Sequence, residues 1–314
     1  MARRPSHPAA PTDPVDPRVI RGPRLSSGEV VHLLDPRGNK YTITLESGKA
    51  LHTHRGQIEH DSLIGLAPGV TVHSTKDVEF LVMRPQLDDY VLGMPRGAAV
   101  VYPKDAARIV ALADVGDGSS VIEAGAGSGA LTCYLVRAAG SHGRVLSIEA
   151  RADFADIATE NVRRWFGGTP RTWSIQVGTF QDVAPGVPAE SANAVVLDML
   201  APWECLPAAD HVLAPGGALV VYVATTTQMS RVVEEMRTSG RWVEPRAEEL
   251  MLRTWHLDGL AVRPDHRMNG HTGFLVSTRR MAPHSAPPRR HRRPAPGAYG
   301  SDYSGPGAME SPGD

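Results

Sequence analysis

The stretch Val121-Ile122-Glu123-Ala124-Gly125-Ala126-Gly127-Ser128-Gly129-Ala130-Leu131 decides the fold of this chain. It begins as an apolar strand, breaks into a glycine-rich turn and opens a helix. Glu149 stands about 20 residues after Gly129, at the end of the next apolar run, Val145-Leu146-Ser147-Ile148. A glycine turn after one strand and a carboxylate after the next is the pattern by which an α/β fold binds a ribose-bearing cofactor.

The spacing of the glycines narrows the choice of cofactor. Gly125, Gly127 and Gly129 follow the pattern G-x-G-x-G, whereas a dinucleotide fingerprint needs its third glycine where Ala130 stands. The Gly-Lys-Ser/Thr of a P-loop is absent from the turn. Glycine lets the backbone approach a ligand closely, and the acidic Glu123 suits a cationic sulfonium better than a pyrophosphate. The pattern favours S-adenosylmethionine over NAD, the alternative being a purely structural turn.

Acidic residues also follow the second and third strands. Glu149 would accept hydrogen bonds from both ribose hydroxyls through its two oxygens, or would stabilise the start of the helix that follows it. Thr179-Phe180-Gln181-Asp182 offers an acid for an adenine amino group and an apolar residue to cover the ring. The alternative for Asp182 is an ordinary loop acid.

Asp198 is the strongest candidate for a residue that acts on the substrate. It ends the apolar run Val195-Val196-Leu197, at the carboxyl edge where open α/β sheets bind ligands. A carboxylate is costly there unless it is paired or used. Pro202-Trp203 would rigidify the following loop and offer a stacking surface, although Trp203 fits core packing at a helix start equally well.

The pattern along the 314 residues predicts two domains. Residues 18–85 contain short strands, two of which flank Asp35-Pro36-Arg37-Gly38-Asn39, a hairpin signature that indicates a small all-β domain. Residues 86–281 alternate strands and helices after a helical lead-in over 86–118, which predicts a mostly parallel sheet covered on both faces. A helix is expected over 203–213. Two closing strands, near 242–250 and at 272–279, suggest an antiparallel end to that sheet.

Composition excludes several classes of protein. Lys and Arg total 33 against 34 Asp and Glu, so any nucleic-acid contact would use local basic patches. Cys133 and Cys205 form no CxxC pair, which argues against a metal or disulfide site and favours a reduced, cytoplasmic protein. No apolar run approaches the ~20 residues that span a membrane. The proline-rich segments 1–17 and 282–314 are expected to be disordered.

Basic residues and histidines near the C-terminus were considered as ligands. Their spacing matches no zinc pattern, so we interpret them as solvated or structural, with RNA contact as the lesser alternative. The same applies to the basic run in the tail. These residues are His256, His266, His271, Arg253, Arg263, Arg267 and Arg289–Arg293.

Several segments together resemble the bacterial and archaeal tRNA (adenine-58-N1)-methyltransferases, and the resemblance is closest to actinobacterial members. It spans about Gly22 to Met281. The segments are His52-Thr53-His54-Arg55-Gly56, His60-Asp61, Met94-Pro95-Arg96-Gly97, Val101-Tyr102-Pro103-Lys104-Asp105, Glu123–Thr132, Asp198–Glu204, Tyr222-Val223-Ala224-Thr225 and Arg267-Met268-Asn269-Gly270-His271-Thr272. The resemblance implies a Rossmann-like methyltransferase domain with a small N-terminal β domain, assembled as a homotetramer. It implies methyl transfer from S-adenosylmethionine to N1 of adenine 58 in the T-loop of tRNA.

The resemblance and the residue patterns together give a predicted site. The predicted cofactor-binding residues are Glu123, Gly125, Gly127, Ser128, Gly129, Ala130, Leu131, Glu149, Phe154, Gln181, Asp182 and Asp198. Asp198 is also expected to accept from the adenine N6 amine and to stabilise the cationic product. Tyr102 or Trp203 would stack on the adenine once it is flipped out. Arg55 and Arg96 are candidates for phosphate contacts.

Three alternative functions share parts of this pattern. A methyltransferase for protein carboxyls or small molecules would share the glycine turn and Glu149, but it would not explain the β domain or Asp198 with its Pro-Trp loop. A non-catalytic tRNA-binding subunit would have no need for the acids Glu123, Glu149 and Asp198. An NAD oxidoreductase fails on the glycine spacing.

Overall fold

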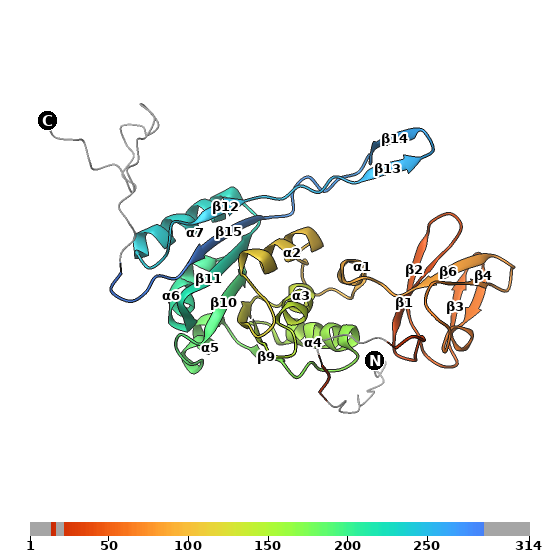
Figure 1. Ribbon diagram of the computed structural model, residues 1–314, viewed down its shortest axis with the longest axis horizontal. Helices are drawn as coiled ribbons and strands as arrows, with labels where there is room; N and C mark the ends of the chain where they lie inside the picture. The colour runs from red at the N-terminus through yellow and green to blue at the C-terminus, as the bar shows by residue number, and fades with distance from the viewer. Residues whose placement is uncertain (1–13, 17–21, 286–314) are drawn as a thin grey trace, which may run out of the picture.

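The computed structural model describes residues 14–16 and 22–285. A small β domain and a larger α/β domain are joined by helix α1 (Leu87–Gly93) (Figure 1). Within the expected leader, Val15 forms a parallel bridge with Pro170 of the α/β domain. The rest of the leader, and nearly all of the expected tail with its basic run, lie outside the described residues.

The α/β domain is built on a seven-stranded sheet with the order β12-β15-β11-β10-β7-β8-β9. The five strands from β11 to β9 in that order run parallel, β15 pairs antiparallel with β11, and β12 pairs antiparallel with β15. This arrangement confirms the predicted α/β sheet and its antiparallel end. The strands are β7 (Ser120–Ala124), β8 (Arg144–Glu149), β9 (Trp173–Val177), β10 (Ala192–Asp198), β11 (Leu213–Val223), β12 (Arg246–Glu248) and β15 (Phe274–Arg279).

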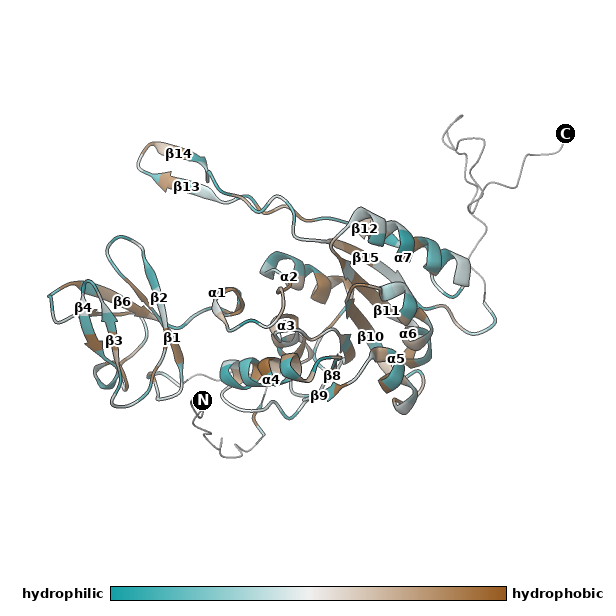
Figure 2. Ribbon diagram, turned by 180° about the vertical axis from the view of Figure 1, so that it is seen from behind, coloured by the Kyte–Doolittle hydropathy of each residue, from teal (hydrophilic) through white to brown (hydrophobic). Residues whose placement is uncertain are grey.

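Helices cover both faces of this sheet, and the core lies on both sides. Successive residues of a strand point to opposite faces, so Val121 and Val196 pack in one cluster while Ile122 and Leu197 pack in the other. Figure 2 shows the apolar strands between helices whose outer faces are hydrophilic. The helices are α2 (Pro103–Leu112), α3 (Ala130–Ala139), α4 (Ala152–Phe166), α5 (Phe180–Val183), α6 (Leu206–Val212) and α7 (Thr226–Ser239). None of the described helices has the length and apolar content needed to cross a bilayer.

The expected helix over 203–213 is present, but it is divided into two helical types. The chain forms a 3-10 turn over Pro202–Cys205, and α6 then begins at Leu206. Pro207 lies in the first turn of α6. Proline has no backbone N–H and clashes with the preceding turn, so it starts a helix more readily than it continues one.

The N-terminal domain is an antiparallel sheet, as predicted, with the order β2-β1-β6-β5. The Asp35 carboxylate accepts from the backbone N–H groups of Arg37 and Asn39, both at 2.9 Å, which fixes the predicted hairpin. A second hairpin was not predicted. The strands are β1 (Val30–Leu34), β2 (Lys40–Thr44), β5 (Val70–His73), β6 (Glu79–Met83) and, in the second hairpin, β3 (Ala50–Thr53) and β4 (Gly56–Glu59).

An unpredicted arm leaves the sheet between β12 and β15. At its tip, β13 (Trp255–Asp258) and β14 (Ala261–Pro264) form a hairpin, and the arm projects to the same side as the β domain (Figure 1). Most of its side chains face solvent, with Leu257 72% and Leu260 103% exposed. Its sequence carries a hairpin signal, the alternation Trp255-His256-Leu257-Asp258 before Gly259, that sequence reasoning passed over.

Candidate active site

The carboxyl ends of four parallel strands meet beside the glycine turn. The backbone N–H of Gly125 donates to the Ile148 carbonyl at 2.9 Å, and that of Gly178 donates to the Glu149 carbonyl at 2.9 Å. The Asp198 carbonyl lies directly against Gly125. The ends of β7, β8, β9 and β10 therefore form one edge, and the predicted residues on them are brought together.

The glycines of the turn serve two different purposes. A Cβ on Gly125 would lie 1.9 Å from the Asp198 carbonyl oxygen, and one on Gly129 would lie 3.1 Å from the Ala158 backbone of α4. These two glycines admit neighbouring protein backbone, a requirement that holds whether or not their own backbone also faces a ligand. Gly127 is different, because a Cβ there would meet only the Ala98 side chain, at 3.5 Å.

Glu149 links the turn to the start of α4. Its Oε2 accepts from the Gly127 N–H at 2.8 Å and its Oε1 accepts from the Arg151 N–H at 3.0 Å. The side chain is only 7% exposed. Each carboxylate oxygen keeps a further lone pair, so Glu149 supports the helix start and is also oriented to accept from a diol.

Ser128 is used inside the protein. Its hydroxyl lies 3.2 Å from the Gly97 nitrogen and 3.2 Å from the Ala98 carbonyl, and the residue is 2% exposed. Ala130 and Leu131 are buried in the first turn of α3. Residues 128–131 therefore offer a ligand their backbone N–H groups at a helix start rather than their side chains.

The residues predicted around an adenine ring lie on the next strand ends. Phe154 is half-buried, with the Arg151 guanidinium 3.8 Å from its ring centroid. Gln181 and Asp182 are exposed in α5, and Asp182 accepts from the Thr179 hydroxyl at 2.6 Å. The hydrogen bond between Gly178 and Glu149 keeps this segment beside Glu149, the acid expected to bind the ribose.

Glu123 is fully buried beneath the turn. Its Oε2 accepts from the hydroxyls of Thr132 at 2.6 Å and Ser147 at 2.5 Å, while its Oε1 has no hydrogen-bond partner among the described residues. Burial raises its pKa to about 7. Glu123 has no exposed surface, so the direct contact with a ligand that the sequence suggested does not occur in this structure. Its influence on the site is electrostatic.

Asp198 lies at the open end of β10 with no partner for its carboxylate in the described part of the chain. Burial, followed by the charges of Glu123 and Glu149, raises its pKa to about 7. None of these three acids forms an ion pair with a described Lys, Arg or His. An edge that gathers uncompensated negative charge attracts a cation and disfavours a pyrophosphate.

Tyr222 connects Asp198 to the acceptor side. It neighbours Asp198 across the β10–β11 pairing, and its hydroxyl donates to the Thr272 carbonyl at 2.7 Å. Burial, then the charges of Asp105 and Asp198, raises the pKa of this phenol. The charge of Tyr102, the half-buried N-cap residue of α2, also raises the pKa of Tyr222. The predicted catalytic residue Asp198 thus neighbours a tyrosine, Tyr222, that sequence reasoning did not single out.

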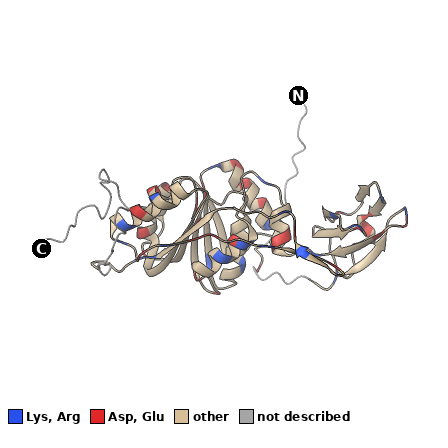
Figure 3. Ribbon diagram, turned by 90° about the horizontal axis from the view of Figure 1, so that it is seen from above, with Lys and Arg blue, Asp and Glu red and all other residues tan. Residues whose placement is uncertain are grey.

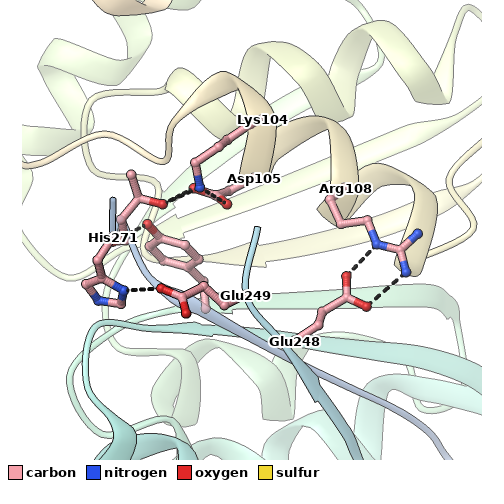
Figure 4. A network of polar contacts seen from close by, with 8 residues as sticks. Lys104, Asp105, Arg108, Glu248, Glu249 and His271 are labelled. Carbon is pink, nitrogen blue, oxygen red and sulfur yellow. Dashed lines mark hydrogen bonds and ion pairs between the residues drawn. The ribbon is translucent and has the colours of Figure 1, made fainter. Parts of the chain in front are cut away.

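A polar network ties α2 to the segment that precedes β15 (Figure 4). The Thr272 hydroxyl donates to Asp105 at 2.6 Å, and Lys104 Nζ donates to Asp105 at 2.8 Å and to Thr272 at 2.5 Å. His271 contacts Glu249 at 2.7 Å and the Ala224 carbonyl at 2.9 Å. These contacts assign His271 a structural role, one of its two predicted interpretations. The bond to Glu249 raises the pKa of His271.

Trp203 packs inside the protein. The guanidinium of Arg231 in α7 lies 4.0 Å from its ring centroid, and the buried indole Nε1 has no partner among the described residues. Gln228 of α7 also donates to the Leu200 carbonyl at 2.9 Å, which holds the same loop. These contacts hold the half-buried Trp203 against α7, and Tyr102 is the better candidate for base stacking.

The two arginines proposed for phosphate contacts differ. Arg55 is 14% exposed at its side chain and forms an ion pair with the buried Asp35 at 2.9 Å, so it stabilises the β domain. Arg96 is exposed. Figure 3 shows acidic and basic residues interspersed over the molecule, in keeping with its net charge of −1.

Comparison with known proteins assigns this chain to a family. A profile described as "tRNA methyltransferase complex GCD14 subunit" matches residues 78–259, more than half of the chain. The chain belongs to this tRNA methyltransferase family. A second profile, described as "TrmI-like N-terminal", matches residues 22–72 in the β domain. The predicted family is thereby confirmed.

Curated relatives in the family cover most of this chain. A protein of Thermus thermophilus named tRNA (adenine(58)-N(1))-methyltransferase TrmI is 34% identical, over 79% of this chain and 95% of its own length. A Methanocaldococcus jannaschii protein named tRNA (adenine(57)-N(1)/adenine(58)-N(1))-methyltransferase TrmI is 29% identical, over 79% of this chain and 93% of its own.

Solved structures share both domains. The tRNA (m1A58) methyltransferase TrmI of Aquifex aeolicus aligns with a TM-score of 0.72 and 25% identity, covering 82% of this chain and 99% of its own. A SAM-dependent O-methyltransferase of Thermotoga maritima aligns with a TM-score of 0.77 and 28% identity, covering 86% and 97%. They confirm the predicted Rossmann-like methyltransferase fold with an N-terminal β domain.

Proposed function

We propose that this protein methylates N1 of adenosine 58 in the T-loop of tRNA, with S-adenosylmethionine as the methyl donor. One observation carries the proposal beyond family membership. The unpaired carboxylate of Asp198, with its raised pKa, lies between the glycine turn and the tyrosines of the acceptor side. An acid in that position can accept a hydrogen bond from an adenine that approaches the methyl donor.

The residues of the edge fit S-adenosylmethionine. Glu149 would accept from the ribose hydroxyls, Asp182 from the adenine amino group, and the N–H groups after Gly127 would face the amino-acid carboxylate. The uncompensated acids, including the orphaned Oε1 of Glu123, would favour a cationic sulfonium. When bound, this cofactor supplies an electrophilic methyl group.

The chain's contribution to the reaction is positioning and electrostatics. N1 of adenine already has an in-plane lone pair, so no strong base is required, and correct alignment supplies much of the barrier reduction. Asp198 accepts from the N6 amine, and its charge stabilises the positive charge that develops on the ring. Tyr102 stacks on the extruded base. A pKa of about 7 keeps Asp198 partly protonated until a cation favours its ionised form.

The test is to incubate unmodified tRNA with labelled S-adenosylmethionine and to map the methylated nucleotide. Asp198→Ala should lower kcat by about 10²–10³-fold, the range for removing a group that stabilises transition-state charge. Asp153→Ala, which removes an exposed acid in the first turn of α4, should leave kcat unchanged. Methylation at another nucleotide would refute the proposed substrate. Wild-type kcat in Asp198→Ala, with cofactor binding intact by calorimetry, would refute the role of Asp198.

We further propose that the protein assembles as a homotetramer in the cytoplasm. The exposed apolar side chains of the arm support an assembly, because isolated monomers rarely expose contiguous apolar patches. Cys133 and Cys205 are buried and free, which agrees with a reducing compartment. A net charge of −1 per chain also favours an assembly that gathers several basic patches around one tRNA.

A further inference from the structure

A cavity lies at the base of the arm. Its volume is about 610 Å³, and it is lined by α1, the start of α2 and the base of the arm. Tyr102, Lys104, Leu252, Arg267, Met268 and Asn269 contribute to its walls. This volume lies within the range of cavities that bind small ligands. Tyr102 lines this cavity and begins the turn of α2 that is tied, through Asp105 and Thr272, to Tyr222 beside Asp198.

The walls of the cavity are held in place by named contacts. Thr272 and His271, just after the lining residues of the arm, are fixed to Asp105 of α2 and to Glu249 before the arm (Figure 4). On the opposite wall, Asp88 of α1 accepts from the Tyr134 hydroxyl at 2.7 Å. The arm therefore leaves the sheet at a fixed position, and the cavity is part of the folded domain.

The chemistry of the lining is that of a nucleotide site. Tyr102, Leu252 and Met268 offer apolar and aromatic surface for the face of a base, and Asp88 and Asn269 offer hydrogen-bonding groups for its edge. RNA-binding proteins recognise unstacked nucleotides by combining these features.

The charge at the mouth of the cavity matches a phosphate. Lys104 is balanced by its pair with the buried Asp105. Arg267 is exposed, and no acid in the described part of the chain forms an ion pair with it. An unbalanced arginine beside an apolar and aromatic wall fits a phosphate together with its base.

We propose that this cavity binds a nucleotide of the tRNA that neighbours the methylated adenosine. The base lies among Tyr102, Leu252 and Met268, and its phosphate contacts Arg267. The inference rests on the proposed function. It gives the arm a role in substrate recognition, since two bases splayed to either side of Tyr102 would be selected together.

The first test compares two arginine variants by steady-state kinetics on full-length tRNA. Arg267→Ala should raise KM about tenfold, the loss of one charge-assisted hydrogen bond, with kcat unchanged. It should also reduce the slope of log KM against log salt by about 0.7–0.9. Arg263→Ala removes the same charge from the exposed strand β14 outside the cavity and should change KM much less.

The second test locates the base. A series of tRNAs, each abasic at one position flanking the target adenosine, is assayed with the wild type and with Met268→Ala. One abasic position should raise the wild-type KM, and the same position should have little additional effect in Met268→Ala, because the contact is already lost. Met268 is 40% exposed, so its truncation should leave folding intact.

The outcomes separate the two proposals. Failure of the wild type to methylate tRNA at all refutes the proposed function. If the wild type methylates tRNA but Arg267→Ala and Arg263→Ala behave alike, and no abasic position is masked by Met268→Ala, then the cavity does not bind a nucleotide. A change in assembly size on Arg267→Ala without a change in KM would show that a second copy of the chain covers the cavity, and would also overturn the inference.

Discussion

Around the glycine turn, Glu123, Ser128 and Glu149 are at most 7% exposed and each is hydrogen-bonded, whereas at the base of the arm Leu252 and Met268 are 59% and 40% exposed. The residues proposed to bind the cofactor are therefore held in place by contacts within one chain. The acceptor side presents surface that another molecule must cover. The residues around the glycine turn are pre-organised before a ligand binds. Selection of the substrate then depends on the base of the arm, where contacts form only on binding.

The largest effect is expected where the turn is tightest. Gly125→Ala places a Cβ 1.9 Å from the Asp198 carbonyl on a backbone with φ +93°. We expect about 3 kcal/mol of lost stability, from overpacking and the left-handed conformation together, with loss of cofactor binding. Thermal unfolding and calorimetric titration with S-adenosylmethionine measure both.

Gly127→Ala is the matched control, because its Cβ would meet only Ala98 at 3.5 Å. It carries the strain of a positive φ alone and should lose about 1–2 kcal/mol. Equal losses in Gly125→Ala and Gly127→Ala would contradict the idea that Gly125 admits the Asp198 backbone.

The next largest effect concerns the stability that the folded chain loses when Asp198 ionises. Its pKa of about 7 in the folded chain lies above the unfolded value of about 3.9. The unfolded state therefore ionises first, and stability is lost as pH rises from about 4 through 7. Asp198→Asn should be more stable than the wild type by roughly 2 kcal/mol at pH 8, with a smaller gain at pH 5. Denaturant unfolding at the two pH values checks this.

Asp182→Asn, an exposed acid near the same edge, serves as the control and should show little pH-dependent gain. A wild type as stable at pH 8 as Asp198→Asn would mean that the acidic edge is well solvated. The contrast between a strained cofactor side and a relaxed acceptor side would then be lost.

A smaller effect is expected at the junction of the two sides. Thr272→Val removes the hydroxyl that donates to the fully buried Asp105. Lys104 still pairs with Asp105, so the loss should be about 1 kcal/mol. The KM for tRNA should rise as the arm loosens. Thr71→Val, exposed in β5, is the control and should alter neither stability nor KM.

The smallest effect on folding belongs to the arm. Leu257→Ser with Leu260→Ser should change the stability of the chain by less than about 0.5 kcal/mol, because both side chains are exposed. The same change should reduce the mass of the assembly, measured by light scattering on a sizing column. Leu81→Ser, on an exposed position of β6, should not. A monomeric wild type would refute the homotetramer.

Much of the fold followed from local pattern. The run from Val121 to Leu131 has the strand, turn and helix that were predicted, because a buried parallel strand and a glycine turn are written in adjacent residues. The hairpin around Asp35 was equally local. The arm was not predicted, although Trp255 and Leu257 alternate with polar residues ahead of Asp258-Gly259, because its strands are only four residues long.

The site was predictable in part, for a similar reason. Strand-end acids such as Glu149 and Asp198 are visible in sequence because they interrupt apolar runs. Contacts over long separations are not, and Thr272 reaches Asp105 across 167 residues. Sequence identifies the small Gly125 and the acidic Glu123 without telling what lies against them, and the structure supplies that: the Asp198 backbone for Gly125 and full burial for Glu123.

The direct pairing of β12 with β15 has a consequence for how this protein can change. Glu248 lies opposite Leu275, so β12 and β15 hold the edge of the sheet together where residues 249–273 leave it. Lengthening or exchanging a segment between two paired strands costs little loop-closure entropy. The exposed hairpin of β13 and β14 can therefore change in length and sequence while Leu250 and Thr272, which contact the domain at the base of the arm, keep their places.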